Sequence, residues 1–135
     1  VSSKLVERAE WEGLTSRAES DPKDVATWFI TTLDGESWCC LPLHRALTMN
    51  PPVTVVAALL KAQPESILYT DNLGQKPLGI ACKFKSSLEV IRLLVGEHIC
   101  RQASKEDGEM ALNLAINANH PDLDRVIIFF QRFHP

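Results

Sequence analysis

The chain of 135 residues is long enough for one domain with a hydrophobic core, and its 45% hydrophobic and 23% charged residues are ordinary for a globular protein. A disordered chain is excluded, because it would need fewer apolar residues and more net charge. The net charge of −3 argues against nucleic acid as a partner, and no apolar run approaches the ~20 residues of a membrane-spanning helix.

Residues 1–35 are expected to form a pair of helices that caps one end of a larger array. The first helix has apolar residues at amphipathic spacing: Leu5, Ala9, Leu14 and Ala18. The second is predicted to begin at Asp21-Pro22 and to end at Asp34-Gly35, with an apolar stripe made of Val25, Trp28, Phe29 and Leu33. The three tryptophans either seal this end or form a cage for a cationic ligand, and the sequence favours the seal: Trp11, Trp28 and Trp38.

The rest of the chain contains a motif that occurs three times at a spacing of 34 or 35 residues. Its first part covers residues 41–47, 76–82 and 110–116, with a small alanine at the same place in each copy: Ala46, Ala81 and Ala115. An apolar second part follows at 55–60, 89–94 and 125–130. Because both parts keep nearly the same period, each unit is predicted to be two short antiparallel helices.

Local signals for helix starts and turns accompany the motif. Proline stands early in the first helix of two units, where its missing N–H costs nothing: Pro42 and Pro77. Ser86 and Glu89 have the spacing of a capping box at the start of a second helix. Gly74 and Gly108 are expected in tight turns that need a positive φ.

The middle unit resembles the ankyrin repeat, whose pattern is Asp-x-x-Gly-x-Thr-Pro-Leu-His-x-Ala followed by a Val-x-x-Leu-Leu helix. The residues that carry this resemblance are Asp71, Gly74, Pro77, Leu78, Ala81, Val90, Leu93 and Leu94. The first unit matches with Pro42-Leu43-His44 and Ala46, while the third departs with Ala111 for proline. The units are also similar to the divergent ankyrin-like arrays of diatoms and related algae, with a Trp before Leu-Pro-Leu-His.

This resemblance implies an all-α fold, namely an ankyrin-type α-solenoid of stacked antiparallel helix pairs. One continuous domain is expected, with a degenerate capping pair at 1–35 and repeats at about 36–70, 71–104 and 105–135. The resemblance also implies that His44 orders neighbouring turns by hydrogen bonding, in place of acting as a catalytic base.

A stack of this kind offers a long ridged surface without a deep pocket, which favours the binding of another protein. The sequence therefore predicts a non-catalytic protein–protein interaction scaffold or assembly subunit, with a partner along its turn tips and concave helix surface. Two alternatives stay open: a regulatory domain of a larger enzyme, and a structural subunit permanently buried in a large complex. No catalytic residue, cofactor or metal site is predicted, since the adjacent Cys39 and Cys40 are poorly placed to bind one ion.

The candidate partner-binding residues lie in the expected turns and at the ends of the expected first helices. They are Asn72, Leu73, Gln75, Lys76, Glu106, Asp107 and Glu109 in the turns, and Thr48, Met49, Lys83, Phe84 and Asn117 at the helix ends. Leu73 stands out because turn tips usually carry polar residues. Phe84 either anchors a partner or packs under the adjacent loop. A C-terminal apolar face is expected to be covered by a partner or by further chain: Phe129, Phe130 and Phe133.

Cysteine and charge patterns bear on the surroundings of the chain. Four cysteines are too few and too irregular for a disulfide framework, and no Asn-x-Ser/Thr acceptor for glycosylation is present. We therefore expect an intracellular, reducing compartment such as the cytoplasm, the nucleus or an organelle. Residues 38–105 carry eight basic and four acidic residues between acidic ends, which favours solvated helix faces over a site for an acidic partner.

Overall fold

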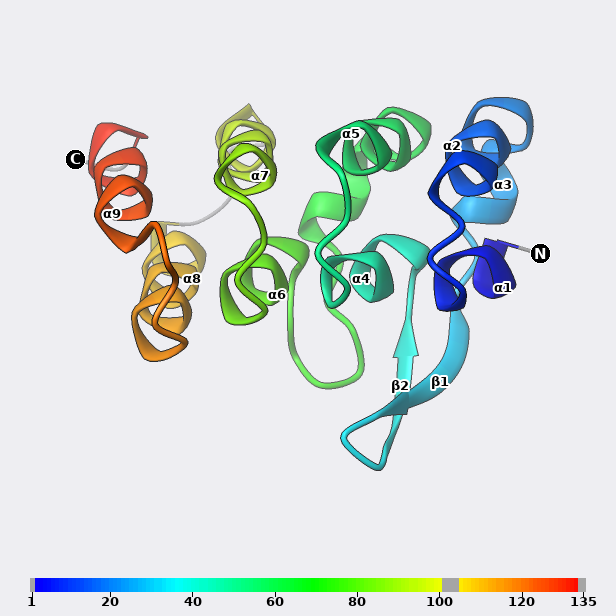
Figure 1. Cartoon of the computed structure of the whole chain (residues 1–135), viewed down its shortest axis with the longest axis horizontal. Helices are drawn as coiled ribbons and strands as arrows, with labels where there is room; N and C mark the ends of the chain where they lie inside the picture. The colour runs from blue at the N-terminus through cyan, green and yellow to red at the C-terminus, as the bar shows by residue number, and fades with distance from the viewer. Residues whose placement is uncertain (1, 101–104, 134–135) are drawn as a thin grey trace.

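The computed structural model of the chain describes residues 2–100 and 105–133, apart from the side chains of residues 99, 100, 105, 132 and 133. Its helices lie in two rows (Figure 1). One row contains α1 (Ser2–Glu7), α4 (Pro42–Leu47), α6 (Pro77–Lys83) and α8 (Lys105–Asn117). The other contains α2 (Trp11–Ser20), α5 (Val53–Ala62), α7 (Leu88–Cys100) and α9 (Leu123–Phe133), with the short α3 (Pro22–Val25) beside α2 and the 3-10 helix η1 (Pro64–Leu68) after α5.

The core lies between the two rows. Neighbouring helices within each row contact each other, and each helix of the α1 row also contacts the next long helix in the chain. Fully buried alanines in α4, α6 and α8 let these helices approach their neighbours closely: Ala46, Ala81 and Ala115. Within the described residues, no helix is both long and apolar enough to cross a lipid bilayer.

A β-hairpin projects from the α1 row (Figure 1). It consists of β1 (Phe29–Leu33) and β2 (Glu36–Cys40), which pair antiparallel with Phe29 opposite Cys40 and Leu33 opposite Glu36. The turn between them is Asp34-Gly35, with φ of 52° and 82°. An Asp-Gly pair with both φ angles positive matches the right-handed twist of the two strands, so this dipeptide favours a tight hairpin.

The prediction of an all-α, ankyrin-type α-solenoid of stacked antiparallel helix pairs is therefore wrong. The chain is a small mixed domain, mainly helical, with a two-stranded antiparallel sheet. The expected second helix stops at Val25, and Phe29 and Leu33 lie in β1, where alternate side chains face the core. The division into units at 1–35, 36–70, 71–104 and 105–135 stays a prediction, and residues 101–104 and 134–135 lie outside the described parts of the chain.

Three further helix boundaries differ from those expected. The first N-terminal helix is interrupted at Ala9, whose φ of 54° separates α1 from α2. The hydroxyl that caps α7 belongs to Ser87, which accepts a hydrogen bond from the N–H of Val90 at 3.3 Å, and not to Ser86. Gly74 does have a positive φ of 79°, as predicted, whereas Gly108 lies inside α8.

The turn expected around Gly108 is absent because the third motif lacks a proline. The residue before a proline is driven away from helical angles, so Pro42 and Pro77 force α4 and α6 to begin where they do. At the matching place in α8 stands Ala111, which imposes no such limit. The helix therefore begins earlier, at Lys105, and takes Glu106 and Asp107 into its first turn, where acidic groups are favourable.

Candidate functional site

The start of α4 lies against the chain that follows η1, and His44 links the two by hydrogen bonds. We call this contact the α4 joint. The Nδ1 of His44 accepts a hydrogen bond from the N–H of Leu41 at 3.0 Å, and its Nε2 donates to the carbonyl oxygen of Tyr69 at 2.9 Å. These partners fix the neutral tautomer with the proton on Nε2. Burial holds the pKa of His44 below its ordinary value of 6.5, against the opposing effect of the bond to Tyr69. The hydrogen bonding that the sequence resemblance implied for His44 is thus present.

A loop of residues 71–75, between η1 and α6, forms the next part of the surface. The buried carboxylate of Asp71 accepts hydrogen bonds from Trp38 Nε1 at 2.7 Å and from the N–H groups of Leu73 and Gln75 at 3.0 and 2.7 Å. Gly74 supplies the positive φ that the turn requires. Asp71 therefore connects the loop to the core, and Leu73 is left at its tip with 39% of its surface exposed.

The same loop is attached to the hairpin through Asn72. Its side-chain oxygen accepts from the N–H of Cys39 at 2.7 Å, its side-chain nitrogen donates to the carbonyl of Ser37 at 3.1 Å, and its own N–H donates to the carbonyl of Cys39 at 3.3 Å. Asn72 thus continues the hydrogen-bonding pattern of β2 on the side away from β1. Hairpin and loop form one connected surface.

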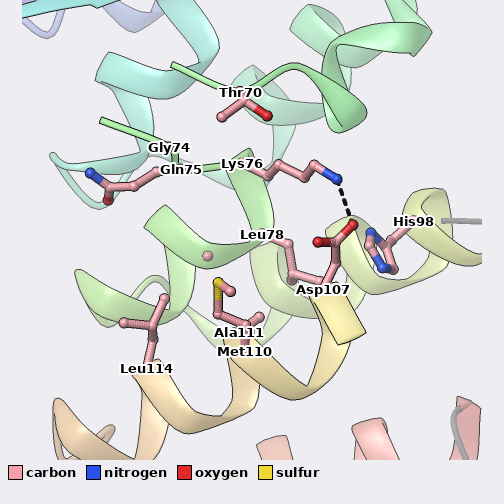
Figure 2. Close-up of a pocket in the computed structure, with 11 residues that line it drawn as sticks. Thr70, Gly74, Gln75, Lys76, Leu78, His98, Asp107, Met110, Ala111 and Leu114 are labelled. Carbon is pink, nitrogen blue, oxygen red and sulfur yellow. Dashed lines mark hydrogen bonds and ion pairs between the residues drawn. The ribbon is translucent and has the colours of Figure 1, made fainter. Parts of the chain in front are cut away.

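A cavity of about 250 Å³ opens between this loop and α8 (Figure 2). Its apolar lining comes from Leu78 in α6 and from Ala111 and Leu114 in α8. Lys76 and Asp107 form an ion pair of 2.5 Å at its rim, which links the start of α6 to the first turn of α8. The remaining lining residues are Thr70, Gly74, Gln75, Gly79, His98 and Met110.

The predicted partner-binding residues fall into two groups. The first group comprises Gln75, Lys76 and Asp107, which line the cavity, Asn72 and Leu73 in the adjoining loop, and Glu106 and Glu109 in the first turns of α8. The other group lies at the C-terminal ends of α4, α6 and α8: Thr48, Met49, Lys83, Phe84 and Asn117. Phe84 is half-buried and packs against the core, and the Lys83 ammonium lies 5.7 Å from its ring centroid. The role of Phe84 as an anchor for a partner stays a prediction.

The C-terminal face differs from the one expected. Phe130 is only 3% exposed and belongs to the core, so the chain itself already covers it, and the cover of this face by a partner or further chain stays a prediction. Phe129 is half-buried, with the guanidinium of Arg92 at 5.9 Å from its ring centroid. The side chain of Phe133 lies outside the described residues.

The tryptophans have separate environments. Trp38 is fully buried and bonded to Asp71, so its ring faces are not available to a ligand. Trp28 is 41% exposed and stacks on Tyr69 at a centroid distance of 6.2 Å, while Trp11 is half-buried on α2. The alternative of a three-tryptophan cation cage is therefore wrong.

Sequence reasoning missed two large exposed apolar side chains on segments joined to the 71–75 loop. Ile30 on β1 is 74% exposed and lies opposite Cys39, the residue that Asn72 binds, and Met110 on α8 is 61% exposed at the cavity. We call Ile30, Leu73 and Met110 the apolar edge, since they lie on three segments that are joined to one another: the hairpin, the loop and α8. The alternating pattern of Phe29–Leu33 would have revealed Ile30, had it been assigned to a strand.

Among the described side chains of the hairpin, the 71–75 loop and α8, the exposed charged ones are acidic. Asp34 and Glu36 are exposed on the hairpin, and Glu106 and Glu109 are exposed in the first turns of α8. The ammonium of Lys76 is neutralised by Asp107. The apolar edge is therefore flanked by negative charge.

Two observations on the described parts of the chain concern metal binding and cysteine reactivity. No group of three or more His, Cys, Asp or Glu side chains there is placed to hold a metal ion. Burial raises the pKa of the Cys40 and Cys82 thiols to about 12, so both are protonated and poor nucleophiles near pH 7. No model of a protein family matches the chain, and no curated protein matches it either.

Proposed function

We propose that this chain is a non-catalytic protein-interaction module that binds another protein along the apolar edge. The observation that carries the proposal is the succession of Ile30, Leu73 and Met110, which are 74%, 39% and 61% exposed on three connected segments. Exposed apolar side chains that gather on one surface have a free-energy cost in water, and such surfaces mark interaction sites.

The rigidity of the loop supports this proposal. Asp71 and Asn72 together make the hydrogen bonds that hold the loop on β2 and on Trp38. Polar groups thus position an apolar tip, where a turn would normally carry a polar residue. A partner that covers Leu73 meets a surface that is already in place.

The test is affinity capture from the native source with three single variants. Leu73→Asp and Ile30→Asp place a charge on the apolar edge, whereas Ile128→Asp does the same on α9, where Ile128 is 57% exposed and away from the edge. We expect specific partners, identified by mass spectrometry, to be retained by the wild type and by Ile128→Asp but reduced at least about tenfold by either edge variant.

Folding of each variant is checked by circular dichroism and by its unfolding midpoint. If folded edge variants retain the same partners as the wild type, the proposed function is wrong. Equal losses in the edge variants and in Ile128→Asp would also contradict it, because the effect would then not depend on the edge.

A further inference from the structure

The cavity beside α8 exists because one side chain is missing. The residues before the prolines of α4 and α6 have nearly the same backbone angles, with φ and ψ of −89° and 160° at Leu41 and of −95° and 160° at Lys76. Two residues after each proline, α4 has His44 and α6 has Gly79. The imidazole fills the α4 joint, whereas none of the described side chains fills the corresponding place at α6.

The space next to Gly79 confirms this reading. Among the described residues, a Cβ atom built on Gly79 would have one neighbouring atom within 4 Å outside its own helix, Cδ1 of Leu114 at 3.4 Å. That distance is at the short end of an ordinary van der Waals contact, so the position tolerates a Cβ atom without moving Leu114. Gly79 thus forms part of the wall of a real void and is not required by close backbone packing.

The size of the void indicates what kind of group it holds. A cavity of about 150 Å³ lined by apolar side chains takes up a benzene-sized molecule, and pockets for drug-sized ligands usually exceed about 300 Å³. At about 250 Å³, the cavity has room for one large apolar side chain. Leu78, Ala111 and Leu114 supply the apolar contacts for it.

The surrounding charge indicates the neighbours of that side chain. Glu106 is one helical turn before Met110, and Glu109 is next to it in sequence, both exposed. Lys76 does not offset these carboxylates, because it is paired with Asp107. A segment that approaches the cavity is therefore attracted if its flanking residues are basic and repelled if they are acidic.

We infer that this cavity binds one apolar side chain, of leucine, methionine or phenylalanine size, from a partner segment whose flanking residues are basic. The inference rests on the proposed function and adds the chemistry of the partner. Gly79 and the walls of the cavity determine the fit, and the carboxylates of α8 select the charge.

The chain has two methionines, which allows a direct test by methyl NMR. Met110 lines the cavity, whereas Met49 follows α4 and is not among the lining residues. Protein labelled with ¹³C in its methionine methyl groups is titrated with a short synthetic peptide that has a central leucine between arginines. We expect the Met110 signal to shift and to saturate with a dissociation constant at or below about 1 mM, while the Met49 signal stays in place.

Two control peptides separate the apolar and the electrostatic contributions. Replacing the central leucine by serine is expected to weaken binding at least about tenfold, because the buried apolar side chain is lost. Replacing the arginines by glutamates is expected to abolish the shift. Equal binding of the leucine and serine peptides, or equal shifts of both methionine signals, would overturn the inference.

Two variants at one position complete the test. Gly79→Leu fills the cavity and is expected to abolish the Met110 shift, whereas Gly79→Ala leaves most of the space open and retains it. Both variants keep or raise the unfolding midpoint, since each removes a glycine from a helix, so loss of binding is not loss of folding. If the peptide binds Gly79→Leu with unchanged affinity, the inference about the cavity is wrong. If the native partners are still lost in Leu73→Asp, the proposed function stands without it.

Discussion

The chain enters α4 and α6 with nearly the same backbone angles, but the space beside the start of each helix is occupied differently. At α4, the imidazole of His44 occupies the joint and connects the N–H of Leu41 to the carbonyl of Tyr69. At α6, Gly79 leaves a cavity whose rim is bridged by Lys76 and Asp107. A single side chain therefore decides whether a joint adds to the stability of the domain or leaves a space for a ligand.

The largest expected effect concerns the closed joint. His44→Ala leaves the buried N–H of Leu41 and the carbonyl of Tyr69 without their partner, so we expect a loss of about 3 kcal/mol in the free energy of unfolding. Urea unfolding followed by circular dichroism measures it. The control is Asn113→Ala at the matching but exposed place in α8, with an expected change within about 0.5 kcal/mol. A loss below about 1 kcal/mol for His44→Ala would show that the joint is not closed by this residue.

A smaller effect is expected from pH. The pKa of His44 in the folded state lies below its ordinary value of 6.5 because the buried ring resists charging. The unfolded chain therefore takes up this proton first, so the stability from His44 is full above about pH 6.5 and is lost as the pH falls through the folded-state pKa. Protonation removes only the acceptor at Nδ1, while Nε2 still donates to Tyr69, which limits the loss.

The pH effect is measured as the unfolding midpoint in urea between pH 7.5 and pH 5. The comparison is with His44→Gln, whose side chain carries no charge at either pH, so that the difference between the two profiles isolates the contribution of His44. The wild type is expected to lose more stability on acidification than the variant. Identical pH profiles would contradict a neutral His44 in the folded state.

The smallest effect concerns the open joint. Gly79→Ala adds a methyl group that meets only Leu114 and reduces the freedom of the unfolded chain, so we expect a gain of ~0.5–1 kcal/mol. Gly74→Ala is the contrasting control, because the φ of 79° at Gly74 disfavours any side chain and a loss of about 1 kcal/mol follows. Thermal unfolding of the two variants should move in opposite directions, and a destabilised Gly79→Ala would mean that the cavity is not open.

The sequence was informative where a residue type restricts the backbone directly. Pro42 and Pro77 marked the starts of α4 and α6, and Gly74 marked a turn with positive φ. The prediction of a helix through residues 25–33 was wrong, because an apolar stripe at helical spacing and the alternation of a strand overlap there. The Asp34-Gly35 dipeptide could have decided between them, since it favours a hairpin over the end of a helix.

The candidate site was predictable only in part. Leu73 was selected correctly as an exposed apolar turn residue, and Lys76 and Asp107 were both selected although the sequence does not show that they meet. The cavity itself escaped prediction. A void depends on the absence of a side chain at Gly79 and on the distance between α6 and α8, and no local pattern in the sequence encodes that distance.

The attachment of the 71–75 loop has a consequence for how fast and how tightly a partner of the proposed kind would be held. Because Asp71 and Asn72 already immobilise the loop against Trp38 and β2, association spends little free energy on ordering the protein. Because the surface is already ordered before binding, association rates should be set by diffusion and charge attraction. Differences among partners should then appear in their dissociation rates.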